Sequence, residues 1–294
     1  MAEYDARWGA DFRLTHYGAD VIEAFVILPW WSGLSAKIVQ DSKTSWQVEP
    51  MLQSIKDAVN LPMPDPAAPD VCADIIAKRA NNPDKAIFSL MLAPLDILYP
   101  LRLSGLYTDM LDYPDVIHDI LRRVRPVLIE AARRVCEQDI DVLYLAGDIC
   151  GRNGAMVSPK HLQEFLFDYV SDVIGIAHEM GKKVFYHSDG YVLDILDLYM
   201  EYGIDGCNPV EPRYNDAKEF VRRSNGKLAL YGGLDNCNII PNGTVEEVRE
   251  HVRNQFEILS ESGLIFSTHD IPGTCPRENL DAMVGAIKAC AWNI

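Results

Sequence analysis

From about residue 115 onward, the chain alternates amphipathic stretches of helical length with short apolar runs. This order is typical of repeated strand-helix units, in which parallel strands are buried beneath covering helices. Six apolar runs are too short for helices and are the expected strands: 87–92, 142–146, 183–187, 206–209, 228–231 and 264–267. Their spacing favours an α/β fold, a (β/α)8 barrel of the TIM type, over an all-β fold, and 294 residues suffice for one such barrel.

Two helix starts are marked by capping residues. Ser158 followed by Pro159 provides an N-cap and a proline at the first helical position, which predicts a helix over 160–180. Thr244 and Glu247 form a capping box, because each side chain can satisfy a free backbone N–H at the start of a helix. A helix over 245–260 is therefore expected.

The first 85 residues do not follow this alternation. Pro29 precedes two tryptophans, and three prolines fall within 61–66, which breaks any regular pattern. Because no flexible Gly/Ser linker separates this segment, we expect one domain over 1–294, with 1–85 as an elaboration packed on the rim of the barrel. A separate small N-terminal domain is the alternative.

Charge and composition narrow the function classes. The net charge of −16, without a strong basic patch, disfavours nucleic acid and membrane surfaces as partners. No apolar run approaches the roughly 20 residues that cross a bilayer, and the first residues lack the pattern of a signal peptide. Seven scattered cysteines are typical of reduced thiols, so we expect a cytoplasmic protein. No Walker loop or dinucleotide fingerprint follows a strand, which disfavours nucleotide binding.

In a parallel barrel, the carboxyl ends of the strands form the active-site face. Polar residues follow the expected strands at this face: Asp148, His187, Asp189, Glu211, Asp235 and His269. A single histidine at a strand end is as often structural as functional, and Asp148 and Asp235 are as well suited to capping loops as to catalysis. Two histidines and several carboxylates at one mouth, however, favour a catalytic or metal site there.

The segment 156–283 resembles the uroporphyrinogen decarboxylase superfamily. The ordered matches are Met156-Val157-Ser158-Pro159 with Glu164-Phe165, then His187-Ser188-Asp189-Gly190, Gly203 to Pro212, Tyr231 to Asp235, Gly243 to Val248, and Pro276 to Asn279 with Ala282-Met283. The resemblance implies a barrel and one of two chemistries. One is metal-free decarboxylation of a porphyrinogen, and the other is zinc-dependent methyl transfer involving a corrinoid protein or a small thiol.

The second chemistry is favoured, because the decarboxylases resembled here use an arginine-rich stretch near the N-terminus, where Arg7 and Arg13 stand isolated. The methyltransferases typically carry a histidine and two cysteines as metal ligands. Aligned by motif, this chain has His187, Asp189 and His269 at those places, a harder set of ligands that still suits zinc. Asp148, Glu211 and Asp235 are then the expected catalytic residues, as proton donors or as groups that orient the ligands.

We therefore expect a methyltransferase similar to the first component of an O-demethylase. It would move a methyl group from a small methylated compound, such as a methoxylated aromatic, to a corrinoid protein, with zinc as a Lewis acid. A metal-free decarboxylase is the first alternative, with Arg102, Arg152 and Arg213 as the available anchors for carboxylates. A barrel that binds a corrinoid or another small molecule without catalysis is the second.

Overall fold

A computed structural model describes residues 16–40, 45–269, 271 and 274–291. One parallel sheet runs in the order β1-β4-β5-β8-β9-β10-β11. Its strands are β1 (Val21–Phe25), β4 (Ala86–Leu92), β5 (Val142–Ala146), β8 (Lys183–His187), β9 (Gly206–Asn208), β10 (Ala229–Gly233) and β11 (Leu264–Ser267). Two small antiparallel pairs accompany it: β2 (Lys37–Gln40) with β3 (Ser45–Glu49), and β6 (Cys150–Gly151) with β7 (Gly154–Ala155).

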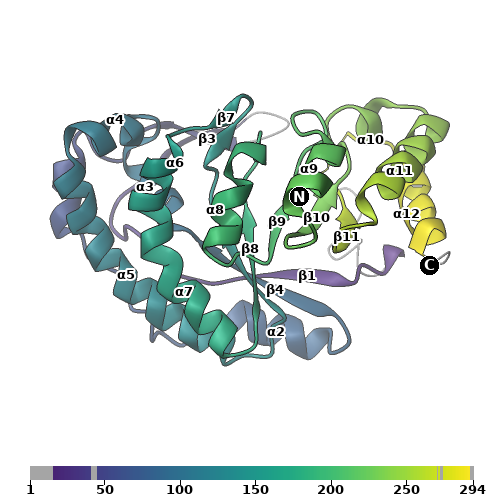
Figure 1. The fold of residues 1–294 in the computed structure, drawn as a ribbon. Helices are drawn as coiled ribbons and strands as arrows, with labels where there is room; N and C mark the ends of the chain where they lie inside the picture. Colours follow the sequence, from purple (N-terminus) through teal and green to yellow (C-terminus); the bar gives the residue numbers. More distant parts are fainter. Residues whose placement is uncertain (1–15, 41–44, 270, 272–273, 292–294) are drawn as a thin grey trace.

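Helices connect successive strands and cover the outside of the sheet (Figure 1). They are η2 (Ile55–Asn60), α2 (Ala73–Asn81), α3 (Pro94–Arg102), α4 (Gly105–Asp112), α5 (Pro114–Cys136), α6 (Pro159–Leu162), η3 (Gln163–Phe167), α7 (Asp168–Glu179), η4 (Leu193–Ile195), α8 (Leu196–Glu201), α9 (Ala217–Ser224), α10 (Ile239–Asn242), α11 (Val245–Leu259) and α12 (Arg277–Ala291). The predicted capping box at the start of α11 is present, with both hydrogen bonds between Thr244 and Glu247 formed.

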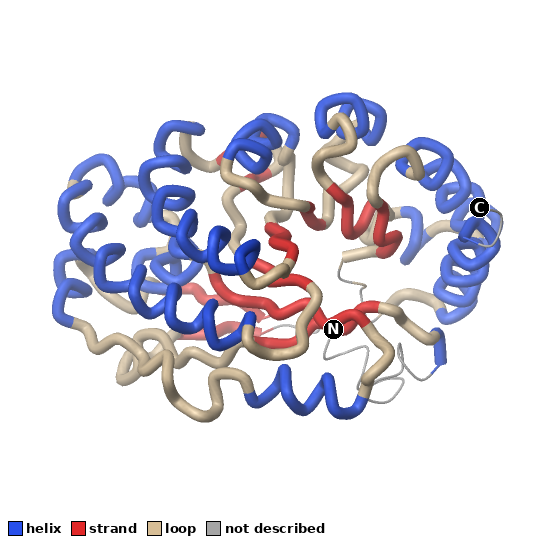
Figure 2. Tube along the Cα trace, turned by 60° about the horizontal axis from the view of Figure 1, so that its bottom comes forward, coloured by secondary structure: helices blue, strands red, loops and turns tan. Residues whose placement is uncertain are grey.

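The expected α/β architecture of the barrel type is confirmed. All six predicted strands occur, and 142–146, 183–187 and 264–267 match β5, β8 and β11 at both ends. Among the described residues the sheet has seven strands and not the expected eight, and no pairing joins β1 to β11. The sheet is therefore a curled half-barrel, as the strands in the centre of Figure 2 show.

The curl brings the two ends of the sheet toward each other. The hydroxyl of Tyr231 in β10 donates a hydrogen bond of 3.0 Å to Oε1 of Glu23 in β1, across the inside of the sheet. Gly206 in β9 pairs with Phe185 in β8, and a Cβ at Gly206 would lie 2.5 Å from the Phe185 ring. Because glycine leaves this space empty, the ring can lie over the neighbouring strand inside the curl.

The N-terminal segment contributes both a sheet strand and an appendage. β1 lies within 1–85, the segment expected to be a rim elaboration, yet it pairs with β4 as a strand of the main sheet. The pair β2 and β3 stays outside the main sheet, and most of its side chains are exposed. Val39 of β2 lies opposite Trp46 of β3, and Val48 lies on the same face, so this pair exposes apolar side chains.

Packing is divided between the inside of the curled sheet and its outer layer of helices. Phe88, Tyr144 and Phe185 pack inside the curl, with the Phe88 and Phe185 ring centroids 5.4 Å apart. Outside, α5 packs along α7 and α11 along α12, at opposite sides of the molecule in Figure 1. The carboxyl ends of the strands are left to present polar side chains, which is where the candidate site lies.

Candidate functional site

Three of the predicted site residues meet at the carboxyl ends of β8 and β11. His187 is the last residue of β8, Asp189 follows two residues later, and His269 follows β11 by two residues. The two imidazole ring centroids are 4.8 Å apart, with 36° between the ring planes. Since β9 and β10 separate these strands in the sheet, the curl of the sheet is what brings the two histidines together.

The three side chains have the spacing of a metal-binding group. Their ligand atoms all lie within 4.8 Å of one another, and Oδ1 of Asp189 is 3.4 Å from Nε2 of His269 and 3.9 Å from Nε2 of His187. Ligands about 2.1 Å from a tetrahedral ion lie roughly 3.4 Å from one another. The arrangement is thus slightly wider than a loaded zinc site, and small side-chain movements would close it.

The environment of Asp189 is a second observation that favours a metal ion at this group. Its Oδ1 atom is buried, yet it makes no hydrogen bond to any residue that the structure describes. Burial raises the pKa of Asp189, while the nearby His269 and His187 act in the opposite direction. A buried carboxylate oxygen without a hydrogen bond is costly, and a cation between the imidazoles would satisfy it.

Asp148 lies at the edge of this group. Its Oδ1 accepts a hydrogen bond of 3.0 Å from the backbone N–H of Asp189 and lies 3.6 Å from Nε2 of His187. The side chain is about half exposed, 51% by relative area. Asp148 therefore holds the backbone of Asp189 in place and presents its carboxylate to the mouth of the curled sheet.

Glu211 is buried beneath the loop that carries Asp189. Its Oε2 accepts a hydrogen bond of 2.8 Å from the backbone N–H of Gly190, and its Oε1 accepts one of 2.9 Å from Nε of Arg213. Only 3% of Glu211 is exposed. The structure thus places it next to the predicted metal group, where it fixes the loop after β8.

Asp235 binds its own loop after β10. Its Oδ1 accepts hydrogen bonds of 2.9 Å from the backbone N–H groups of Cys237 and Asn238, and its own N–H donates to Nε2 of His251. Burial acts to raise the pKa of Asp235, but these hydrogen bonds hold it below the ordinary value. Asp235 is therefore an ionised acceptor that caps a turn.

One titratable residue near the site was not predicted from the sequence. Asp96 lies in the first turn of α3, and burial raises its pKa to about 7, with a further contribution from the negative charge of Asp148. A Cβ at Gly147 would lie 2.5 Å from Oδ2 of Asp96 and 2.8 Å from the hydroxyl of Tyr186. Glycine at 147 therefore makes room for Asp96 beside Asp148. The signal in the sequence is an aspartate four residues after the end of the predicted strand 87–92.

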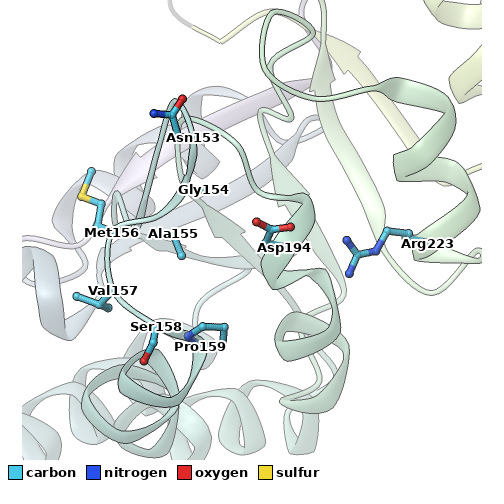
Figure 3. Close-up of a pocket in the computed structure, with 9 residues that line it drawn as sticks. All are labelled: Asn153, Gly154, Ala155, Met156, Val157, Ser158, Pro159, Asp194 and Arg223. Atoms are coloured by element: carbon cyan, nitrogen blue, oxygen red, sulfur yellow. The ribbon is translucent and has the colours of Figure 1, made fainter.

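A cavity of about 570 Å³ lies elsewhere, between the β6 and β7 hairpin and α9 (Figure 3). It is lined by 153–159 together with Asp194 and Arg223. The predicted site residues do not line it, and in Figure 3 Asp194 and Arg223 extend from different elements than 153–159. The cavity is therefore not formed by the predicted site residues at the strand ends.

Within the described residues, no helix combines the length and the apolar character needed to span a membrane. A comparison with curated protein sequences finds no match. Among solved structures, a methyltransferase from Methanosarcina mazei is similar, with a TM-score of 0.72 and 17% identity, over 95% of this chain and 83% of that one. Xylanase B from Clostridium stercorarium F9 is more distant, with a TM-score of 0.46 and 13% identity over 74% of this chain and 84% of that one.

The comparison with family models covers nearly the whole chain. The model described as uroporphyrinogen decarboxylase (URO-D) matches residues 14–290, which include every strand of the main sheet and all three residues of the proposed metal group. The parallel curled sheet and the position of the polar residues at its carboxyl edge agree with that match. The chain belongs to the uroporphyrinogen decarboxylase family.

Proposed function

We propose that the chain is a methyltransferase with a metal ion held by His187, Asp189 and His269. The observation that carries the proposal is the buried Oδ1 of Asp189, which has no hydrogen bond among the described residues and faces both imidazoles. Membership of the URO-D family and the likeness to a structure named as a methyltransferase support the same assignment. Zinc is the metal we propose, since imidazole and carboxylate are both ordinary zinc ligands.

Such a cation would neutralise charge on the oxygen or sulfur from which the methyl group departs. The chain itself would supply the proton that the departing atom then takes up. Asp96, with its pKa raised to about 7, keeps its proton in a large fraction of molecules near neutral pH, beside the exposed carboxylate of Asp148. We propose Asp96 and Asp148 as the proton-handling pair, with Glu211 and Asp235 holding the loops.

The proposed methyl donor is a small methylated compound, a methoxylated aromatic being one chemical class that fits. The proposed acceptor is the corrinoid of a partner protein. Decarboxylation of a substrate with many carboxylates would instead need free cationic anchors. Of the three candidate arginines, Arg213 pairs with Glu211, Arg102 pairs with Asp109 at 2.6 Å, and only Arg152, which is exposed, is left. One such anchor is too few for a substrate with many carboxylates. Methyl transfer is therefore the better supported chemistry.

The test is metal analysis followed by an activity assay. Protein purified without chelator should carry about one zinc per chain, and His187→Ala and His269→Ala should each lose it. His178→Ala is the matched control, because His178 also contacts a carboxylate, Asp205 at 2.8 Å, but lies in α7. Its zinc content should be unchanged.

Loaded protein should then transfer methyl groups from methoxybenzoates to cob(I)alamin. Metal-free protein that consumes a porphyrinogen would overturn the proposal in favour of a decarboxylase. Tight corrinoid binding without any methyl transfer would overturn it in favour of a binding protein.

A further inference from the structure

The buried amide of Asn208 lies directly behind His187. Asn208 is the last residue of β9 and pairs in register with His187, the last residue of β8. Only 3% of Asn208 is exposed, so its amide must find its hydrogen-bond partners within the protein. The side chain makes three contacts: Nδ2 to the backbone oxygen of Tyr231 at 2.5 Å, and Oδ1 to the Tyr144 hydroxyl and to Nδ1 of His187, both at 2.7 Å.

These contacts determine which way the amide faces. A backbone carbonyl oxygen only accepts hydrogen bonds, so the atom of Asn208 that faces Tyr231 must be the NH₂ group. The oxygen then faces Tyr144 and His187. Since the amide oxygen also only accepts, both of these neighbours must donate to it.

The proton on Tyr144 supports the same arrangement. The hydroxyl of Tyr144 lies 2.7 Å from Oδ1 of Asn208 and 3.3 Å from Nδ1 of His187. If its single proton pointed at His187 instead, Oδ1 of Asn208 would face lone pairs on both neighbours and accept nothing from either. Only a proton on Nδ1 of His187 satisfies all three side chains at once.

We propose that Asn208 is a positioning residue that fixes the Nδ1–H tautomer of His187 and so directs the lone pair of Nε2 into the mouth of the sheet. Nε2 is the nitrogen that faces Asp189 and Asp148, at 3.9 and 3.6 Å from their Oδ1 atoms. A histidine ligand binds a metal through its unprotonated nitrogen, and a hydrogen bond from the other nitrogen orients the ring. The consequence for metal binding rests on the proposed function, whereas the tautomer itself does not.

The first experiment uses the unaltered metal-free protein. Two-dimensional ¹⁵N–¹H NMR of protein labelled at histidine distinguishes a protonated ring nitrogen from an unprotonated one, and the loss of one set of signals in His187→Ala assigns His187. At a pH where the ring is neutral, Nδ1 should be the protonated nitrogen. A proton found mainly on Nε2 would overturn the proposal, whatever the protein does with metals.

The second experiment compares variants by the same spectrum and by zinc titration against a chromophoric chelator. Asn208→Leu removes the acceptor and should give a mixture of tautomers and zinc affinity weaker by roughly 10- to 100-fold. Tyr144→Phe leaves Oδ1 available to His187 and should keep the Nδ1–H tautomer. Asn279→Leu is the matched control, because Asn279 is also buried and donates to backbone carbonyls, those of Ile240 and Gly243. Asn279→Leu should change neither the tautomer of His187 nor the zinc affinity.

The outcomes separate this inference from the proposed function. An Nδ1–H tautomer that Asn208→Leu converts to a mixture supports the inference even in a protein that binds no zinc, in which case the proposed function fails alone. An unchanged tautomer in a folded Asn208→Leu protein would overturn the inference while leaving the metal site standing.

Discussion

Nε2 of His269 lies 3.4 Å from Oδ1 of Asp189, although their strands, β11 and β8, are separated in the sheet by two others. The resemblance described in the sequence analysis implies a cysteine ligand at position 189, where this chain has a carboxylate. Oxygen ligands are harder than thiolates, so the identity of residue 189 should govern which metals the group prefers.

Asp189→Cys is expected to shift the metal preference toward softer ions. Cadmium should gain affinity relative to zinc by about tenfold or more, because a thiolate replaces a carboxylate. Substitution with Co²⁺ should produce a thiolate charge-transfer band in the near ultraviolet that the unaltered protein lacks. Asp194→Cys, which places a thiol at the separate cavity of Figure 3, is the control and should show neither change.

Asp96→Asn is expected to stabilise the fold at alkaline pH. The folded pKa of about 7 lies above the unfolded value, so the contribution of Asp96 is fully present below about pH 4 and is lost as the pH rises through 7. At pH 8.5 the variant should therefore be more stable by about 1–3 kcal/mol, or a few degrees in Tm. Thermal unfolding at pH 5 and pH 8.5 checks this. A difference that does not grow with pH would contradict the assignment of a raised pKa.

Gly147→Ala is expected to destabilise the protein by about 1–3 kcal/mol, because the new Cβ would lie 2.5 Å from Oδ2 of Asp96 and 2.8 Å from the Tyr186 hydroxyl. Gly175→Ala is the control, since Gly175 lies within α7 and nothing is within 4 Å of its added Cβ. There, the better helix propensity of alanine should give a gain of about 0.5–1 kcal/mol. Urea denaturation of both variants provides the comparison, and equal effects would argue against close packing at Gly147.

Asp235→Ala is expected to cost about 1–3 kcal/mol at pH 7, because two backbone N–H groups lose their acceptor. The pKa of Asp235 is lowered, so its contribution is present above about pH 4 and is lost as the pH falls through the folded value. The difference in free energy of unfolding between the variant and the unaltered protein should therefore be smaller at pH 3.5 than at pH 7. Asp197→Ala removes a carboxylate that is 78% exposed and should change stability by less than about 0.5 kcal/mol at either pH.

The strands that could be predicted from the sequence are those without a charged residue in their interior. β5 and β8 are such runs, and their ends match the structure. β1 was missed because Glu23 interrupts it, and the reason for that glutamate, a hydrogen bond from Tyr231 in β10, exists only once the sheet has curled. Local pattern carries no information about such a distant partner.

The same limit applies to the site. The rule that strand ends share one face predicts that His187, Asp189 and His269 lie close together, as they do in the structure, and their role as metal ligands stays a prediction. The rule could not distinguish Asp235, which binds its own loop, from Asp148, which lies near His187, because the difference depends on the direction of the side chain. Asp96 was not predicted, because its raised pKa follows from burial near Gly147 and Tyr186 and not from its position in a motif.

The missing side chain at Gly206 has an effect well beyond its own strand. Because the Phe185 ring occupies that space, the packing of β8 against β9 depends on a contact inside the molecule, two residues before His187. Enlarging residue 206 would push β8 and β9 apart, and each degree of flattening would separate the imidazoles further at the rim. The geometry of the proposed metal group should thus depend on aromatic packing at a distance, and redesign of the proposed ligands should begin with that ring.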